Sequence, residues 1–114
     1  MITLSELPRY DFENKTVMIT GAGQGIAAAA ARAFAERGAK VGISDRHHDR
    51  AEETAAGIRE SGGIAAGFAT DVSQEQEVVN AAEQIAAEFG NIDILINAAG
   101  SYGKGFRRTH DTPL

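Results

Sequence analysis

The sequence contains no cysteine and no tryptophan, and only two of its 114 residues are proline. Without cysteine the chain can form no disulfide and offers no thiolate to zinc, to an iron–sulfur cluster or to nucleophilic catalysis. Its longest apolar run, residues 26–31, is far shorter than the roughly 18 residues of a candidate membrane span. The N-terminus lacks the basic start and apolar core of a secretory signal. We therefore expect a cytoplasmic protein that does not enter membranes.

Positive charge is also scarce, because 16 acidic side chains outnumber 11 Lys and Arg and leave a net charge of -5. That balance repels phosphate backbones and anionic membrane surfaces, so nucleic acid is not an expected partner. Hydrophobic residues make up 43% and charged residues 24%, which is typical of soluble globular proteins. A chain of this length suits one core. We expect one domain over residues 1–114, with residues 1–11 as a polar lead-in.

Four short apolar runs, each ending in glycine or a polar residue, predict strands. They cover residues 16–20, 40–45, 64–70 and 92–97. Helices are predicted between them, over residues 24–37, 49–61 and 73–89, with glycine closing each one. Asp49 with Glu52 and Ser73 with Gln76 have the spacing of capping boxes.

Apolar residues at helical spacing predict which helix faces are buried. The first helix has Ile26, Ala30, Ala33 and Phe34, and the third has Val78, Val79, Ala82, Ile85, Ala86 and Phe89. The last strand is apolar almost throughout, as expected of a strand covered on both faces. Strands alternating with helices predict an α/β fold with a parallel, Rossmann-like doubly wound sheet, truncated after the fourth strand.

Ligands of such sheets bind beyond the carboxyl ends of the strands. The first predicted strand runs into the glycine-rich turn Gly21-Ala22-Gly23-Gln24-Gly25 and then directly into a helix. Glycines let the backbone approach a pyrophosphate, which also meets the positive end of the helix dipole. The turn does not match the dinucleotide-binding motif G-x-G-x-x-G. It matches only the less specific form G-x-G-x-x-A, through Gly23, Gly25 and Ala28. A tight turn without a ligand therefore stays an alternative.

Each of the other strand ends also carries a candidate residue. Asp45 stands 24 residues after Gly21, close to where an acid accepts hydrogen bonds from an adenosine ribose. The alternative is that Asp45 only caps the loop that follows it. Asp71 follows the third strand, and Asn97-Ala98-Ala99-Gly100 follows the fourth.

Taken together, these signatures resemble the short-chain dehydrogenase/reductase family over about residues 12 to 114. The resemblance implies that Gly21, Gly23, Gln24, Gly25 and Ile26 form the turn over the pyrophosphate and nicotinamide side of a bound dinucleotide. It further implies that Asp45, followed by Arg46, lies at the adenosine ribose, and that Asp71 and Val72 hold the adenine. Residues Asn97, Ala98, Ala99 and Gly100 would brace the central strand. The expected cofactor is NAD, with NADP less favoured, because the charge of Asp45 repels a 2′-phosphate while Arg46 could accommodate one.

Two positions differ from the family pattern. Ala27 stands where a third glycine is usual, and Ala98 where the family has a second asparagine. The resemblance also implies a catalytic Tyr-x-x-x-Lys pair, which members of the family share. The two tyrosines of this chain, Tyr10 and Tyr102, are instead followed four residues later by Asn14 and Phe106. We therefore predict no catalytic residue in this chain, and an alcohol or ketone substrate only if a catalytic half is present.

Two other functions are alternatives to this one. A stand-alone module that binds NAD without chemistry fits the sequence equally well. A phosphate-accepting receiver domain would need acids after the first strand, where Thr20 and Gly21 stand. Adjacent His47 and His48 point apart, so no metal site is expected, and the basic run at residues 104–110 is expected to be solvated. The fourth strand is expected to be a free edge that promotes self-association through residues 92–97.

Overall fold

The computed structural model describes residues 11–21, 23 and 25–98. In chain order the elements are β1 (Thr16–Thr20), α1 (Gly25–Glu36), β2 (Lys40–Asp45), α2 (His48–Glu60), β3 (Ile64–Ala69), α3 (Glu75–Phe89) and β4 (Ile94–Asn97). The alternation of strand and helix predicted from the sequence is confirmed. Most of the predicted lead-in, Tyr102 and the basic run lie outside the described residues.

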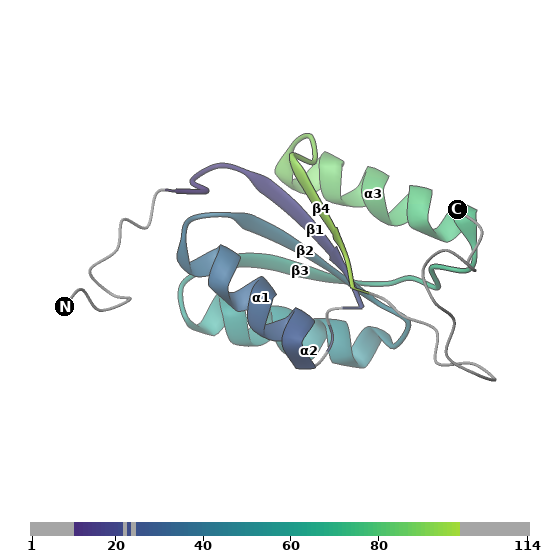
Figure 1. Ribbon diagram of the computed structural model, residues 1–114, viewed down its shortest axis with the longest axis horizontal. Coiled ribbons are helices and arrows are strands. Elements are labelled where there is room, and N and C mark those ends of the chain that lie inside the picture. Colours follow the sequence, from purple (N-terminus) through teal and green to yellow (C-terminus); the bar gives the residue numbers. More distant parts are fainter. Residues whose placement is uncertain (1–10, 22, 24, 99–114) are drawn as a thin grey trace, which may run out of the picture.

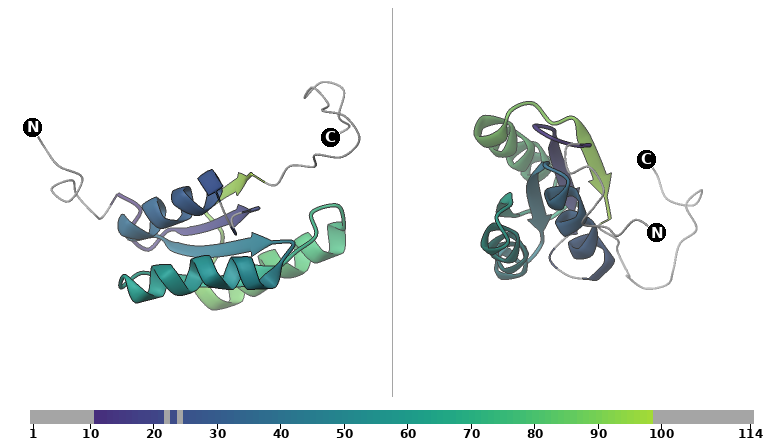
Figure 2. Two further views of the ribbon diagram at one scale, coloured as in Figure 1. Left: turned by 90° about the horizontal axis from the view of Figure 1, so that it is seen from below. Right: turned by 90° about the vertical axis from the view of Figure 1, so that its left-hand side faces the viewer.

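The four strands form one parallel sheet in the order β3-β2-β1-β4. Helices α1 and α2 cover one face of this sheet, and α3 lies on the other (Figures 1 and 2). Because the chain moves from β1 outward to β3 and then returns to place β4 beside β1, the strand order reverses between β1 and β4. The predicted Rossmann-like doubly wound architecture is confirmed.

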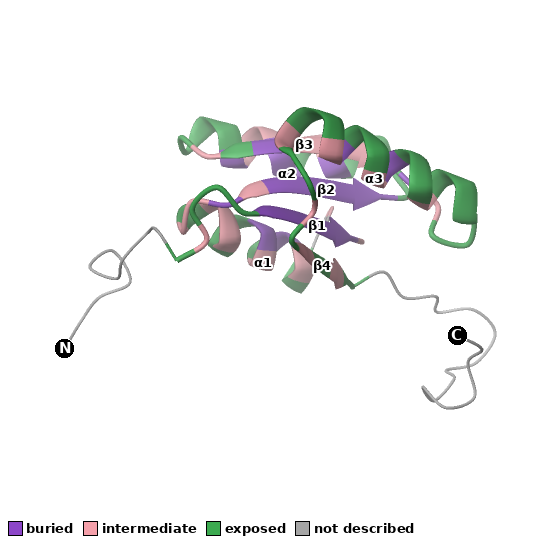
Figure 3. Ribbon diagram, turned by 90° about the horizontal axis from the view of Figure 1, so that it is seen from above, coloured by how far each residue is buried: buried purple, intermediate pink, exposed green. Residues whose placement is uncertain are grey.

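The core lies on both faces of β1 and β2, which are buried along nearly their whole length (Figure 3). On the α1 and α2 face, the buried residues are Val17, Ile19, Ala31, Ala39, Val41, Ile43, Ala51, Ala55, Ile58 and Ala65. On the α3 face, Met18 packs against Ala81 and Ile85. Small alanines on the helices allow close packing on the β-branched residues of the strands.

Two glycines in the strands allow the helices to approach the sheet. A Cβ added at Gly42 would lie 2.4 Å from Cδ1 of Ile85, and one added at Gly67 would lie 2.8 Å from backbone atoms of Ala51 and Glu52. The close approach of α3 to β2 and of α2 to β3 therefore depends on glycine at these positions.

Both predicted capping boxes are wrong. Helix α2 has His47 as its N-cap residue, α3 has Gln74, and neither side chain makes a capping hydrogen bond. The Ser73 hydroxyl instead donates to Oδ1 of Asp71 at 2.6 Å, so it is engaged in the preceding turn. Asp49 lies inside the first turn of α2, where its charge still suits the helix dipole.

The predicted buried faces of α1 and α3 are partly wrong. Ile26 is 91% exposed and Val79 is 40% exposed, and Ala33 is exposed as well. The residues buried in α1 are Ala28 and Ala31. An alanine-rich helix offers apolar residues on several faces, so periodicity alone does not select the one that packs.

Strand β4 begins at Ile94, two residues later than predicted. It pairs with β1 and stands at the end of the strand order among the described residues. The prediction that it is covered on both faces is wrong, because Leu95 is 61% exposed. Ile94 and Ile96 are half-buried and pack against the core on the α1 and α2 face.

Candidate functional site

The carboxyl ends of all four strands meet at one edge of the sheet, because the strands are parallel. There the ends of β1 and β4 are joined side by side. The Thr20 hydroxyl donates to Oδ1 of Asn97 at 2.7 Å, and the Ala98 N–H donates to the Thr20 carbonyl at 3.2 Å. This junction lies where the strand order reverses, which is where ligands bind in open α/β sheets.

Directly after β1 comes the predicted glycine turn, of which the structure describes Gly21, Gly23 and Gly25. Gly21 has a φ of 71° and Gly25 a φ of 69°, a region that glycine adopts without the steric cost of a Cβ. No atom of the described residues lies within 4 Å of a Cβ added at Gly25, so in this part of the structure the backbone is open where α1 begins. The first turn of α1 carries no acidic side chain that would oppose an anion at this positive helix end.

Asp45, at the end of β2, is tied directly to the glycine turn. Its Oδ2 accepts the Gly23 N–H at 3.0 Å, and its Oδ1 accepts the His47 N–H at 2.8 Å. The residue is 8% exposed. A Cβ at Gly23 would lie 2.6 Å from Oδ2 of Asp45 and 2.6 Å from Cβ of Arg50, so the contact requires glycine. The alternative that Asp45 caps the following loop is thus confirmed, through the His47 N–H.

Asp71 and Val72 follow β3, at the same edge of the sheet. Hydrogen bonds from the Ser73 hydroxyl and the Ser73 N–H to Oδ1 lower the pKa of Asp71, and the positive charge of Arg46 lowers it further, against an opposing effect of desolvation. Val72 is 44% exposed, and Arg46 is exposed. An ionised carboxylate and an accessible apolar side chain therefore stand together after β3.

The predicted site residues within the described part of the chain all lie along this edge or in the turn. Gln24, Ala99 and Gly100 lie outside the described residues. Two threonines that were not among the predicted site residues also bond to this region: Thr20, which bonds Asn97, and Thr54 in α2, whose hydroxyl donates to the Gly23 carbonyl at 3.2 Å. A threonine between the buried apolar residues of a helix is the signal that could have identified Thr54.

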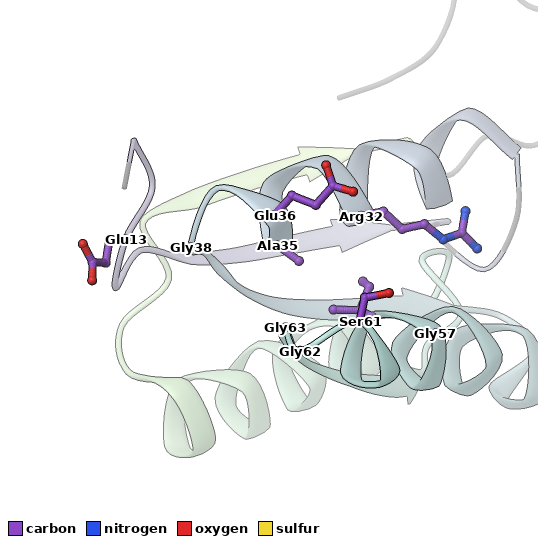
Figure 4. A pocket seen from close by; sticks show the side chains of 10 residues that line it. Glu13, Arg32, Ala35, Glu36, Gly38, Gly57, Ser61, Gly62 and Gly63 are labelled. Carbon is purple, nitrogen blue, oxygen red and sulfur yellow. The ribbon is translucent and has the colours of Figure 1, made fainter. Parts of the chain in front are cut away.

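A pocket of about 520 Å³ lies at the opposite edge of the sheet, between the C-terminal ends of α1 and α2 (Figure 4). Its lining residues include Glu13, Gly38 and Gly63, which precede β1, β2 and β3. It is thus separate from the site at the carboxyl ends.

Within residues 11–21, 23 and 25–98, no three His, Asp or Glu side chains are grouped as metal ligands would be. No helix in that part is long and apolar enough to cross a membrane.

Comparison with known proteins gives a consistent result. Residues 15–113 match the family model described as short chain dehydrogenase. An uncharacterized oxidoreductase, YxbG, from Bacillus subtilis is 47% identical over 102 residues, which are 90% of this chain and 37% of that protein. The D-threitol dehydrogenase of Mycolicibacterium smegmatis is 44% identical over 93 residues, 80% of this chain and 36% of the enzyme. The chain therefore spans little more than a third of the length of these relatives.

Solved structures agree with the sequence matches. A hydroxysteroid dehydrogenase from Escherichia coli is 36% identical with a TM-score of 0.79, covering 90% of this chain and 44% of that one. A D-mannonate oxidoreductase from Haemophilus influenza, described as putative and solved with bound NAD, is 31% identical with a TM-score of 0.78, covering 88% and 38%. By its family-model match and the arrangement of its sheet, the chain belongs to the short-chain dehydrogenase family.

Proposed function

We propose that this chain binds NAD at the carboxyl edge of its sheet, as the cofactor-binding part of an oxidoreductase that transfers hydride between nicotinamide and an alcohol or ketone. The observation that carries the proposal is the contact between Asp45 and Gly23, which fixes a carboxylate beside an open glycine turn. NAD bound to the related D-mannonate oxidoreductase structure supports the same cofactor.

Each part of the edge suits one part of a dinucleotide. Gly21, Gly25 and Ile26 at the start of α1 offer backbone N–H groups and a helix dipole to the pyrophosphate. The same role is proposed for Gln24, which lies outside the described residues. The Asp45 carboxylate has roughly four lone-pair sites, of which Gly23 and His47 use two. The remaining sites can accept hydrogen bonds from the ribose hydroxyls. Asp71 and Val72 would hold the adenine. Asn97 to Gly100 would brace β4 beside the nicotinamide, the group that accepts or donates hydride.

Titration calorimetry with NAD and NADP tests the proposal. We expect NAD to bind more tightly by roughly 10- to 150-fold, the equivalent of a charged hydrogen bond of about 1.5–3 kcal/mol. Asp45→Asn should reduce this preference. Asp93→Asn is the matched control, because Asp93 also accepts a backbone N–H, from Thr16 at 2.9 Å, but at the opposite edge. Equal or tighter binding of NADP by the unaltered chain would refute the preference.

We further propose that the 114-residue chain by itself does not turn over alcohols or ketones. Neither Tyr10 nor Tyr102 has a lysine four residues later, and general acid–base help is worth about 10² to 10⁴ in rate. The same observation favours the second candidate function, NAD binding without chemistry. NADH consumption with a panel of carbonyl compounds tests both. Turnover that disappears in Tyr102→Phe would show that Tyr102 is the proton donor.

A further inference from the structure

The buried hydroxyl of Thr54 connects α2 to the glycine turn. Thr54 is 2% exposed and lies on the face of α2 that also buries Ala51, Ala55 and Ile58. Its Oγ1 donates to the Gly23 carbonyl, 31 residues earlier, at 3.2 Å. A hydroxyl buried among apolar side chains costs free energy unless it is hydrogen-bonded. The Gly23 carbonyl supplies this partner.

Gly23 is therefore held from two sides. Its carbonyl is bound by Thr54 of α2, and its N–H is bound by Asp45 of β2. These two bonds hold the backbone N–H and the carbonyl of Gly23 in place. Glycine has more backbone freedom than any other residue, so without them the turn would sample other conformations. A binding loop that is already ordered loses less entropy when its ligand binds.

We propose that Thr54 is a positioning residue that fixes the glycine turn, and through Gly23 the carboxylate of Asp45, in the arrangement that receives the dinucleotide. The inference rests on the proposed function. It differs from a purely structural role, in which the Thr54 bond would stabilise the packing of α2 and affect cofactor binding only through overall stability.

The chain contains a matched control for this difference. Thr16 is 1% exposed, and its hydroxyl donates to the Phe89 carbonyl at 3.0 Å. This is the same kind of buried bond, at the opposite edge of the sheet. Thr54→Val and Thr16→Val each remove one such hydroxyl while nearly preserving side-chain shape, and Thr54→Ser restores the hydroxyl. Thr54→Ala serves as a second variant if Thr54→Val fails to fold by circular dichroism.

The experiment measures three quantities in the full 114-residue chain: the Kd of NAD, the urea midpoint of unfolding, and hydrogen exchange of the Gly23 amide. We expect Thr54→Val to weaken NAD binding by about 2- to 12-fold, the equivalent of one net hydrogen bond, and to speed exchange at Gly23. Thr54→Ser should bind nearly as tightly as the unaltered chain. Thr16→Val should lower the urea midpoint comparably but leave the Kd and the Gly23 exchange rate unchanged.

Two results would overturn the inference. One is a folded Thr54→Val chain with unchanged NAD affinity and unchanged exchange at Gly23. The other is an equal loss of affinity in Thr54→Val and Thr16→Val, which would mean that affinity follows stability alone. If the unaltered chain binds neither NAD nor NADP, the proposed function fails. Gly23 exchange then decides the positioning role by itself: faster exchange in Thr54→Val alone supports it, and unchanged exchange overturns it.

Discussion

Replacing Gly23 by alanine tests the contact between the glycine turn and Asp45 most directly. The new Cβ would lie 2.6 Å from both Oδ2 of Asp45 and Cβ of Arg50, and 2.8 Å from Cγ of Asp45. The Arg50 Cβ is fixed to the backbone of α2, so the carboxylate or the turn itself has to move. Overpacking of this kind costs about 1–3 kcal/mol of folding free energy.

The displaced carboxylate would lose its bond to the Gly23 N–H and, with it, its proposed place beside the ribose. Because a hydrogen bond to a charged group is worth about 1.5–3 kcal/mol, we expect the affinity for NAD to fall by roughly 10- to 150-fold. Calorimetric titration measures the affinity, and urea denaturation measures the loss of stability.

The control is Gly57→Ala, because a Cβ at this α2 position would meet no atom within 4 Å. Alanine is favoured over glycine inside a helix by about 0.8–1 kcal/mol, so this variant should be slightly more stable and bind NAD unchanged. A folded Gly23→Ala chain that binds NAD as tightly as the unaltered one would refute the argument that this close approach positions Asp45.

Two further predictions concern the ends of β3 and β4. Ser73→Ala should raise the pKa of Asp71 toward its ordinary value of 3.8, because the hydroxyl bond that lowers it most is removed. Since the pKa of Asp71 is lowered in the fold, its ionised form stabilises the chain above pH 3.8, and this contribution is lost as the pH falls below that value. An Asp71 titration curve, measured by NMR, that is identical in the unaltered chain and in Ser73→Ala would contradict the predicted rise in pKa. The exposed Leu95 on β4 should promote self-association, so the average mass measured by light scattering should rise with protein concentration. At a given concentration this mass should be lower in Leu95→Lys than in the unaltered chain. It should be unchanged in the control Val79→Lys, which alters an exposed residue of α3. A monomer at every concentration would disprove the edge argument.

The strands were predictable because each is a short apolar run that ends at a glycine or polar residue, and the bounds of β1 and β2 agree with the sequence prediction. The helix starts were not predictable from the sequence, because the side chains that could cap a helix form hydrogen bonds with other groups. The Ser73 hydroxyl is bound to Asp71, and the Asp45 carboxylate binds the His47 N–H ahead of α2. Such choices depend on neighbours in space, which the local spacing of a capping box does not contain.

The burial of residues in β1 and β2 was predictable from their own apolar sequence. The burial of helix residues was predicted less well, because it also depends on the shape of the sheet surface against which the helix packs. Ile85 is buried because Gly42 leaves space for it on β2, whereas Val79, on the same helix, lies 40% exposed. Both positions belong to one apolar stripe in the sequence. The space that Ile85 fills comes from a glycine on a strand 43 residues earlier, so helical periodicity could not reveal it.

Asp45 shows why a structural and a functional interpretation of one residue need not compete. The sequence left open whether it caps a loop or binds a ribose. In the fold, its carboxylate accepts one N–H from the loop after β2 and one from the glycine turn after β1. These two bonds leave about half of its acceptor sites free and remove the rotational freedom that would otherwise be lost on binding. Under the proposed function, the cap holds the Asp45 carboxylate in the orientation that receives a ribose, and a variant that disturbs the cap should also weaken the binding of NAD.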